Sequence, residues 1–286
     1  MAGGHPLSTL RRLASVLLPD GVAESVRRLM RRLTVARYSA YDVRHSYGGL
    51  PLIIRIADPL AQGWYEQDGG AGTEITLLQR RGRLGPAARV FDLGAHQGVV
   101  ALMLAGIVGS EGQVIAVEAV PHNARIATQN ATANACRQLV VLHAAVGAAD
   151  GSLWFEDRWN GAVSTRNGVG IKVDAVTIDT LTGRYGAPAV LFIDVEGFEL
   201  HALRGAARTL TEHRPDLFVE AHVAAGLERF GTMDDLLALI PPDYEVLVAP
   251  GEAGDFAPLA AGVALLGARC RIVALAPRTP EITSHV

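Results

Sequence analysis

Cysteine is scarce in this sequence, which contains only Cys136 and Cys270 among its 286 residues. Two isolated cysteines argue against a disulfide framework and against a zinc site built from thiolates, because both need several cysteines at characteristic spacings. This scarcity is typical of a protein that folds in a reducing compartment, and we expect a cytoplasmic location.

Long apolar runs and a strong net charge are also missing. No run approaches the roughly 18 apolar residues that span a bilayer, and the short apolar stretch after Arg12 lacks the core of a signal peptide. A net charge of −3 gives no reason to expect nucleic-acid binding, which needs a clustered basic surface. Hydrophobic residues make up 49% of the chain and charged residues 19%, a composition that can fill the core of a large domain.

Positive charge gathers at the N-terminus, where residues 1 to 44 hold eight arginines against three acidic residues. A helix over residues 21 to 37 would collect its apolar side chains on one face: Val22, Val26, Leu29 and Leu33. The arginines of this helix lie largely on its other faces. Two roles follow, namely packing against the main domain with the arginine face in solvent, or docking on an anionic membrane or an acidic partner.

From Arg89 onward, apolar runs typical of buried strands alternate with helix-like segments. The predicted strands cover residues 89–93, 113–118, 139–146, 189–195, 215–223, 244–250 and 270–277. The predicted helices cover residues 98–108, 121–134, 197–211 and 232–240. This alternation predicts a mostly parallel sheet built from βαβ units, with an insertion over residues 150–180 that contains short strands at 152–155 and 172–179.

The last two predicted strands lack a helix between them, because residues 251–269 are rich in Gly, Ala and Pro. A loop-linked antiparallel pair suits such a connection better than a right-handed crossover. An ordinary dinucleotide-binding fold keeps its strands parallel, whereas the class I methyltransferase fold inserts its last strand antiparallel. We therefore predict a Rossmann-like α/β domain of that class, with a seven-stranded sheet, over residues 61–286, and a helical extension over residues 1–60.

The segment VFDLGAHQG, residues 90–98, predicts a cofactor site, because a glycine-containing turn separates a buried strand from a helix. Gly94 and Gly98 let a ligand approach the backbone, and their G-x-x-x-G spacing counts against the G-x-G-x-x-G cradle for NAD. Asp92 would repel a pyrophosphate but can accept hydrogen bonds from an ammonium group or from ordered water beside one. Glu118 ends the next predicted strand, where a carboxylate can accept both ribose hydroxyls. S-adenosylmethionine has the matching ammonium, ribose and sulfonium groups and no phosphate.

The chain resembles the FkbM family of S-adenosylmethionine-dependent methyltransferases in five motifs, which occur in the order DLGAHQG, VEAVPHNA, VTIDTL, FIDVEGFELHALRGA and LFVEAH. The resemblance covers roughly residues 60 to 223 and is most specific at IDVEGFE followed by LRGA. It implies methylation of an oxygen atom on a sugar, a glycolipid or a polyketide-type metabolite. Two positions depart from the family. His96 stands where Asn is frequent and keeps a polar side chain, whereas Phe192 stands where Lys is frequent and loses any acceptor contact of that lysine.

The cofactor-binding residues that we predict lie at the glycine turn and the neighbouring strand ends: Glu74, Asp92, Gly94, His96, Gly98, Glu118, Ala145 and Asp194. Glu74 is included because the relatives place an acid before the first strand of the domain. Trp64 and Tyr65 either stack on adenine, roof the acceptor pocket or pack in the core. The polar segment from Trp159 to Asn167 is the candidate loop for recognising the acceptor.

The predicted catalytic residues follow the fourth and fifth predicted strands of the main domain. Methyl transfer to a hydroxyl requires a positioned acceptor and removal of its proton. His222 is the predicted base because histidine titrates near neutral pH, and Glu220, on the same side of the strand, is its predicted orienting partner. Asp194 is predicted to position the hydroxyl. A divalent ion held by these three residues is an alternative that we do not favour, since nothing in the sequence requires it.

The leading hypothesis is therefore an S-adenosylmethionine-dependent O-methyltransferase with a small-molecule or glycan acceptor. A nicotinamide-dependent reductase is the competing enzyme, although the glycine spacing counts against it. The third hypothesis is a binding or scaffold protein that keeps the fold without turnover, and the strand-end acids argue against it.

Overall fold

The computed structural model describes residues 20–156, 160–164, 170–224, 226–251, 254–259 and 269–278. Its helices are α2 (Asp20–Arg37), α3 (Pro59–Tyr65), α4 (Thr73–Arg80), α5 (Val99–Val108), α6 (Pro121–Ala133), α7 (Ile178–Tyr185), α8 (Glu199–Arg204) and α9 (Met233–Leu237), with short helical turns at η1 (Thr209–His213) and η2 (Leu227–Arg229). Its strands are β1 (Tyr41–Tyr47), β2 (Leu50–Ile56), β3 (Arg89–Leu93), β4 (Gln113–Glu118), β5 (Leu139–His143), β6 (Ala145–Val146), β7 (Gly151–Glu156), β8 (Ala162–Val163), β9 (Ile171–Val176), β10 (Val190–Ile193), β11 (Asp216–Ala221), β12 (Glu245–Pro250), β13 (Ala257–Pro258) and β14 (Cys270–Leu275).

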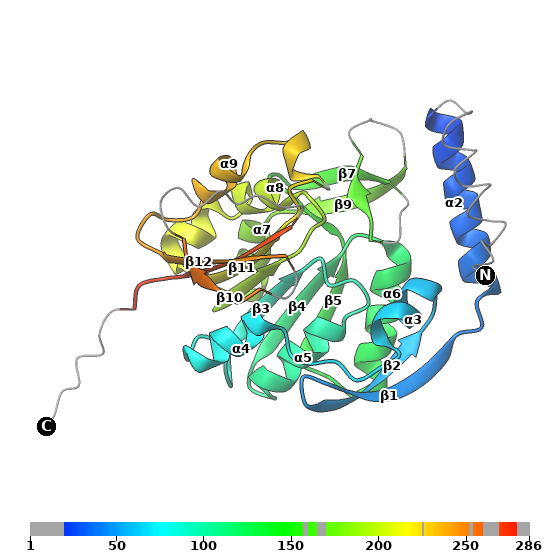
Figure 1. The fold of residues 1–286 in the computed structure, drawn as a ribbon, viewed down its shortest axis with the longest axis horizontal. Coiled ribbons are helices and arrows are strands. Elements are labelled where there is room, and N and C mark those ends of the chain that lie inside the picture. Colours follow the sequence, from blue (N-terminus) through cyan, green and yellow to red (C-terminus); the bar gives the residue numbers. More distant parts are fainter. Residues whose placement is uncertain are drawn as a thin grey trace, which may run out of the picture.

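A mostly parallel sheet forms the centre of the molecule (Figure 1). Over the described residues its strand order is β13-β12-β14-β11-β10-β3-β4-β5, and β14 runs antiparallel to both of its long neighbours, β11 and β12. The strands from β11 to β5 in that order are parallel to one another. Seven of these strands are the predicted ones, and the antiparallel insertion of the last strand confirms the class I methyltransferase fold. The two-residue β13 is an addition at the edge.

Side chains alternate between the two faces of the sheet, and each face packs against its own set of helices. On β3, Val90 belongs to the core cluster that includes α4 and α5, whereas Phe91 belongs to the cluster that includes α7 and α8. Because both faces are covered, these strands are apolar at nearly every position, as buried parallel strands require. Figure 1 shows the three layers, with α4, α5 and α6 on one side of the sheet and α7, α8 and α9 on the other.

Residues 41–56 form an antiparallel hairpin of β1 and β2, which differs from the helical extension predicted over residues 1–60. The reason is a period-two pattern, because alternate side chains of β2 are buried: Leu52, Ile54 and Ile56. The hairpin packs against the main core, and Asn130 of α6 accepts a hydrogen bond from the Arg55 amide at 2.8 Å. The division of the chain at residue 60 stays a prediction.

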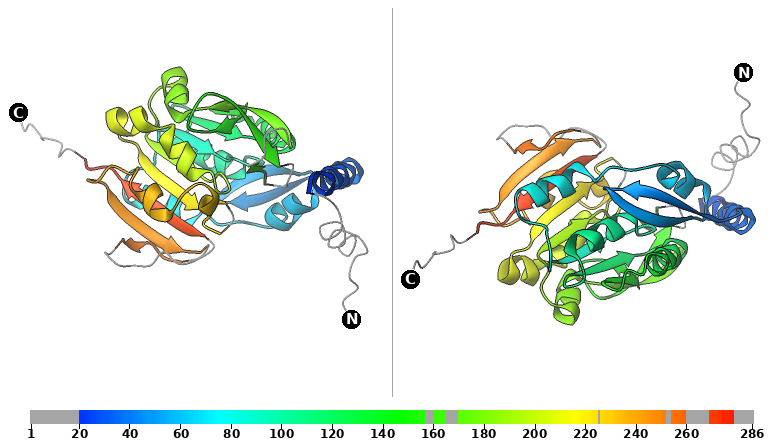
Figure 2. Two further views of the ribbon diagram at one scale, coloured as in Figure 1. Left: turned by 90° about the horizontal axis from the view of Figure 1, so that it is seen from above. Right: turned by 90° about the horizontal axis from the view of Figure 1, so that it is seen from below.

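Helix α2 confirms the predicted N-terminal helix and lies beside the domain (Figure 2). The packing predicted for it, with the arginine face in solvent, agrees with this structure only in part: Arg32 and Arg37 are exposed. Leu29 and Leu33 are 59% and 43% exposed, whereas Arg31 is only 9% exposed. A polar contact joins α2 to the domain in this orientation: Nη1 of Arg28 donates a hydrogen bond to the carbonyl oxygen of Gly170 at 3.2 Å. Over the described residues, no helix is both long and apolar enough to cross a membrane.

A second, smaller sheet with the order β6-β9-β7-β8 is built mainly from the predicted insertion. The antiparallel pair of β7 and β9 confirms both short strands predicted there. The second of them ends earlier than predicted, because the Thr177 side chain accepts the Thr180 amide and caps α7. Strand β6 follows β5 after one residue, Ala144, so the smaller sheet adjoins the carboxyl end of β5.

Candidate active site

A pocket of about 620 Å³ opens at the carboxyl ends of β3, β4 and β10, the position at which open α/β sheets bind ligands. Its lining comes from the turn after β3, the end of β4, the junction of β5 and β6, the turn after β10 and the smaller sheet. Five of the predicted cofactor residues line it: Gly94, His96, Glu118, Ala145 and Asp194.

The turn after β3 requires glycine at two positions. Gly94 and Gly98 have φ values of +96° and +81°, in the left-handed region that favours glycine. A Cβ atom on Gly94 would lie 1.7 Å from the carbonyl oxygen of Asp194, and one on Gly98 would lie 3.0 Å from the Cβ of Ala127 on α6. Glycine thus lets the turn after β3 touch the turn after β10. Of the predicted catalytic residues, Asp194 lines the pocket, and this contact brings it beside the predicted cofactor residues.

Glu118 joins the turn after β3 to the segment after β4, because it accepts one backbone amide from each. Its Oε2 accepts a hydrogen bond from the His96 amide at 2.8 Å, and its Oε1 accepts one from the Val120 amide at 2.7 Å. Burial raises the pKa of its carboxyl to about 8. Each carboxylate oxygen still has a lone pair for a second donor, so Glu118 can hold the turn and accept a ligand hydroxyl together.

His96 and Trp64 form an aromatic wall of the pocket. Their ring centroids lie 5.1 Å apart, and Nδ1 of His96 lies 3.0 Å from the hydroxyl of Tyr65. Burial lowers the pKa of His96 to about 4, so its ring is uncharged at neutral pH. Trp64 lines the pocket and is about half exposed, whereas Tyr65 supports the histidine. The predicted stacking of an adenine ring on these residues stays a prediction.

A buried polar network joins the turn after β3 to α3. Its residues were not among the predicted site residues. Asp58 caps α3 by accepting the amides of Leu60 and Ala61, and its Oδ2 lies 2.6 Å from Nε2 of Gln97 and 2.9 Å from Nε2 of His122. Burial alone would raise the pKa of Asp58, but the hydrogen bonds from His122, the Ala61 amide and Gln97 hold it at about 2. An aspartate before a proline is a helix-start signal that the sequence displays, whereas the contacts with Gln97 and His122 arise only in the folded chain.

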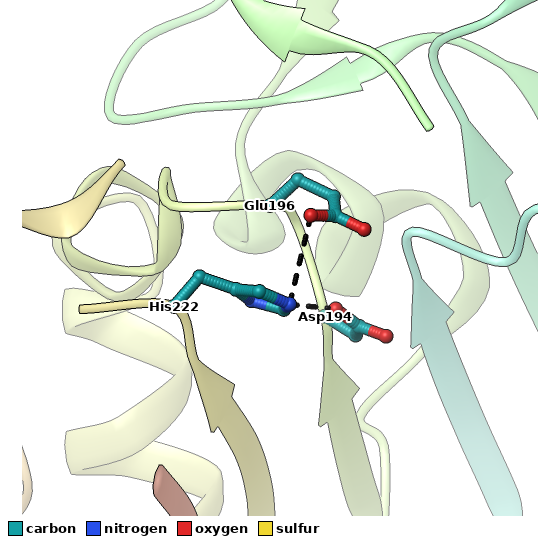
Figure 3. A group of neighbouring side chains, drawn as sticks. All are labelled: Asp194, Glu196 and His222. Atoms are coloured by element: carbon teal, nitrogen blue, oxygen red, sulfur yellow. Dashed lines mark ion pairs between the residues drawn. The ribbon is translucent and has the colours of Figure 1, made fainter. Parts of the chain in front are cut away.

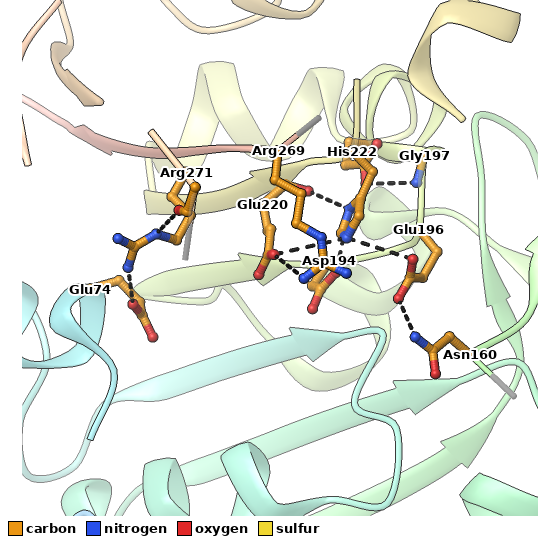
Figure 4. Close-up of polar contacts among 11 residues, drawn as sticks. Glu74, Asn160, Asp194, Glu196, Gly197, Glu220, His222, Arg269 and Arg271 are labelled. Atoms are coloured by element: carbon orange, nitrogen blue, oxygen red, sulfur yellow. Dashed lines mark hydrogen bonds and ion pairs between the residues drawn. The ribbon is translucent and has the colours of Figure 1, made fainter. Parts of the chain in front are cut away.

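Three predicted cofactor residues lie outside the lining of the pocket: Glu74, Asp92 and Gly98. Asp92 is still within β3, where burial raises the pKa of its carboxyl to about 7. Its Oδ2 is buried and has no hydrogen-bond partner among the described residues. Glu74 instead faces Arg271 of β14, with 3.3 Å between Oε2 and Nη1 (Figure 4). The cofactor contacts predicted for Asp92 and Glu74 stay predictions.

His222 lies just after β11 and is fixed by a buried carboxylate. Its Nδ1 is 3.0 Å from Oε1 of Glu199, and the same oxygen accepts the Gly197 amide at 2.8 Å. His222 and Glu199 are 1% and 0% exposed. The residue that orients the imidazole is therefore Glu199. Glu220, which is predicted for that role, has its Oε1 3.9 Å from Nε2 of His222 and pairs with Arg269 at 3.2 Å (Figure 4).

Two further carboxylates, both from the turn after β10, face the same imidazole (Figure 3). Oδ1 of Asp194 lies 3.7 Å from Nδ1 of His222, and Oε2 of Glu196 lies 3.6 Å from Nε2. Burial alone would lower the pKa of His222, but the hydrogen bond to Glu199 and the charges of Asp194 and Glu196 raise it to about 9. The imidazole is then protonated at neutral pH, so the carboxylates are the better acceptors for a further proton.

Unusual backbone geometry places Glu196 in the pocket. Its φ of +51° is uncommon for a residue with a side chain, and Gly197 follows with a φ of +96°. Oε1 of Glu196 accepts a hydrogen bond from Nδ2 of Asn160 at 2.8 Å, so the insertion reaches the acidic group directly. Asn160 belongs to the predicted acceptor loop, of which Trp159 and residues 165–167 lie outside the described residues.

Comparison with protein families gives one decisive match. The model of the methyltransferase FkbM domain matches residues 92–245, which is more than half of the chain. The chain belongs to the FkbM methyltransferase family. The matched region includes the glycine turn, Glu118 and the carboxylates around His222, and it confirms the predicted methyltransferase class. No curated protein matches the chain.

Several solved structures resemble this FkbM chain at low identity. The FkbM methyltransferase of Methylobacillus flagellatus KT is 20% identical, with a TM-score of 0.42 over 65% of this chain and 43% of that one. The 16S rRNA N2 G1207 methyltransferase of T. thermophilus, in complex with AdoMet and guanosine, is 13% identical, with a TM-score of 0.46 over 84% and 51%. Fibrillarin of Aeropyrum pernix, with natively bound S-adenosyl-L-methionine, is 13% identical, with a TM-score of 0.40 over 71% and 74%. The chain thus matches less than half of the Methylobacillus protein.

Proposed function

We propose that this FkbM protein is an S-adenosylmethionine-dependent O-methyltransferase that acts on a hydroxyl of a sugar, a glycolipid or a polyketide-type metabolite. The observation that carries the proposal is a single pocket lined both by Gly94 and Glu118 and by the carboxylates of Asp194 and Glu196. Groups suited to the cofactor and groups suited to a hydroxyl therefore face the same space. Direct transfer between two bound molecules depends on such positioning.

The residues around the glycine turn fit S-adenosylmethionine. Glu118 offers carboxylate oxygens to the ribose hydroxyls, and the aromatic wall of Trp64 and His96 offers a surface for adenine. The unpaired Oδ2 of Asp92 is a buried acceptor behind the turn, suited to a water molecule that bridges to the ligand. When bound, the cofactor supplies a methyl group on a positively charged sulfonium, which favours a pocket with carboxylates in its wall.

Charged and polar side chains continue from the pocket along the carboxyl edge of the sheet (Figure 4). Those that offer hydrogen-bond donors and acceptors beside the pocket are Arg269, Glu220, Asp194, Glu196 and Asn160. Such a set suits a molecule with several hydroxyl groups, because each hydroxyl both donates and accepts. In this proposal the pocket carboxylates receive the proton of the methylated hydroxyl, and His222, fixed by Glu199, keeps them in place.

Titration calorimetry with the full chain tests the cofactor class without knowledge of the acceptor. We expect S-adenosylmethionine and its demethylated product to bind and NAD to show no binding. Binding of NAD without binding of the two sulfur compounds would overturn the proposal and support the reductase.

Transfer of a labelled methyl group to a panel of hydroxylated metabolites and glycans tests the reaction itself. Once an acceptor is found, Asp194→Asn should slow turnover by roughly 10²- to 10⁴-fold, the range for a lost acid–base group. His222→Gln should also slow turnover, because it releases the carboxylates that the imidazole holds. Parental turnover in both variants would show that this acidic group takes no part in the reaction.

A further inference from the structure

We propose that Asp194, Glu196 and His222 form a binding site for one divalent cation, with Mn²⁺ as the ion that best suits them. One donor atom from each residue lies within 4.8 Å of the other two (Figure 3). Metal–ligand bonds of about 2.1 Å in an octahedral site separate ligand atoms by about 3.0 Å when adjacent and about 4.2 Å when opposite. Small side-chain movements therefore bring all three donor atoms onto one ion.

The imidazole of His222 is placed as a metal-binding histidine is. It is 1% exposed, and its Nδ1 lies 3.0 Å from Oε1 of Glu199, which is fully buried. A histidine that binds a metal almost always uses its other ring nitrogen in this way, since the carboxylate fixes the tautomer and the ring direction. Nε2 makes no hydrogen bond within the described part of the chain and faces Oε2 of Glu196 at 3.6 Å. Nε2 therefore lies beside a carboxylate oxygen, as a ligand atom of the same ion would.

The surrounding charges also favour a cation. Oδ1 of Asp194 is buried and has no hydrogen-bond partner among the described residues. Asp194, Glu196 and Glu199 bring three carboxylates to one imidazole, so a cation between them lowers the repulsion among these groups. Glu220 differs from these three, because Arg269 already pairs with it at 3.2 Å. We therefore leave Glu220 out of the ligand set.

The donor set decides the type of ion. Two carboxylates and one imidazole suit Mn²⁺, which accepts oxygen and nitrogen ligands together, whereas Ca²⁺ prefers six to eight oxygen ligands. Asp194 and Glu196 line the pocket, so the remaining coordination positions open toward it. A hydroxyl that binds there loses its proton more readily, because the cation lowers its pKa. The proton then passes to an oxygen of Asp194 or Glu196 that does not bind the ion, and the electron pair stays on the hydroxyl oxygen. This last consequence rests on the proposed function, whereas cation binding does not.

Electron paramagnetic resonance of Mn²⁺ added to the full chain tests the site. We expect one bound Mn²⁺ per chain, with a pulsed-resonance coupling to the nitrogen of one histidine. Glu196→Gln should weaken binding at least tenfold, and Glu199→Gln about 10- to 100-fold, because it removes the partner that orients His222. Glu245→Gln is the matched control, since Glu245 pairs with Arg81 away from the cluster, and it should bind Mn²⁺ as the parent does.

His222→Gln should abolish the nitrogen coupling. Absence of Mn²⁺ binding, binding without a histidine coupling, or unchanged affinity in Glu196→Gln would each overturn the site. Glu196 is partly exposed and Glu199 is buried, so Glu196→Gln keeps the test decisive if the Glu199 variant fails to fold. The measurement contains neither cofactor nor acceptor. Its failure is therefore distinguishable from failure of the proposed methyl transfer.

Discussion

Glu118 uses one carboxylate both to hold the turn after β3 and to face the pocket. We expect Glu118→Gln to weaken S-adenosylmethionine binding by about 10- to 100-fold, because charge-assisted hydrogen bonds, worth about 1.5 to 3 kcal/mol, are replaced by weaker neutral ones. Titration calorimetry measures this change. Glu245→Gln makes the same substitution at a surface ion pair and should leave the affinity unchanged.

The ionisation of Glu118 gives this prediction a pH signature. Burial raises the pKa of the carboxyl to about 8, so the group is mostly protonated at neutral pH before a ligand binds. Ribose hydroxyls donate to the ionised form, and the affinity of the parent should rise between about pH 7 and pH 9. The affinity of the Glu118→Gln variant for S-adenosylmethionine should change less over the same pH range. An equal dependence of affinity on pH in the two proteins would contradict a contact between Glu118 and the ribose.

The pair of Glu199 and His222 predicts how stability depends on pH. An unfolded histidine titrates near a pKa of about 6.5, whereas the pKa of His222 is raised to about 9 in the folded chain. Its stabilising contribution is therefore fully present below about pH 6.5 and is lost as the pH rises through about 9. Glu199→Gln should lower the free energy of unfolding at neutral pH by about 1 to 3 kcal/mol and flatten this dependence. Urea unfolding across the window measures both effects.

A double-mutant cycle supplies the control for this pair. Glu199→Gln should cost less in a His222→Gln background, because the interaction that it removes is already absent there. The same cost in both backgrounds would show that Glu199 stabilises the chain through other contacts, such as its hydrogen bond from the Gly197 amide.

Among the elements, α2 presents an exposed face that mixes leucines with arginines: Leu29, Arg32, Leu33 and Arg37. We propose that this face docks on an anionic membrane surface, with the leucines in the headgroup boundary and the arginines near lipid phosphates. The protein should sediment with vesicles that contain phosphatidylglycerol and stay in solution with phosphatidylcholine alone. Arg37→Gln should weaken the association by about 1 kcal/mol.

The leucines of α2 have a matched control on α5. Combined Leu29→Gln and Leu33→Gln should abolish sedimentation, whereas Val100→Gln, at a side chain that is 39% exposed outside α2, should not. Equal sedimentation with both kinds of vesicle, or with neither, would contradict docking on an anionic surface.

For the whole molecule, the central sheet was predictable because each buried strand is a nearly continuous apolar run. The strand predicted over residues 189–195 is β10, Val190–Ile193. The Gly-, Ala- and Pro-rich sequence over residues 251–269 correctly indicated that β14 pairs antiparallel with β12. The hairpin was less predictable. Its outer strand β1 is largely exposed, and the pair is held by packing against α5 and α6, contacts that the local sequence pattern does not encode.

The residues of the site also differ in how far the sequence could predict their positions, because some depend on local structure and others on long-range contacts. The roles of Gly94, Gly98 and Glu118 were predictable, because each lies at the end of a strand or in the turn after it. The structure places Gly94 and Glu118 in the lining of the pocket. The contact between Glu199 and His222 depends on how the start of α8 folds over the end of β11. Strand alternation favours Glu220 as the partner, but β11 ends at Ala221, so the alternation no longer directs the side chain of His222.

Ligand binding should stabilise the whole molecule, because the pocket is lined by the ends of β3, β4 and β10 together with the smaller sheet. A ligand at about 100 times its Kd that binds only the folded state adds about 2.7 kcal/mol, and each kcal/mol raises Tm by roughly 2 to 4 °C in a chain of this size class. We therefore expect S-adenosylmethionine to raise Tm by about 5 to 10 °C in differential scanning calorimetry. NAD should leave Tm unchanged. The Tm of the Glu118→Gln variant should rise less than that of the parent at the same concentration of S-adenosylmethionine. An equal shift with NAD would mean that the spacing of Gly94 and Gly98 does not discriminate against a pyrophosphate.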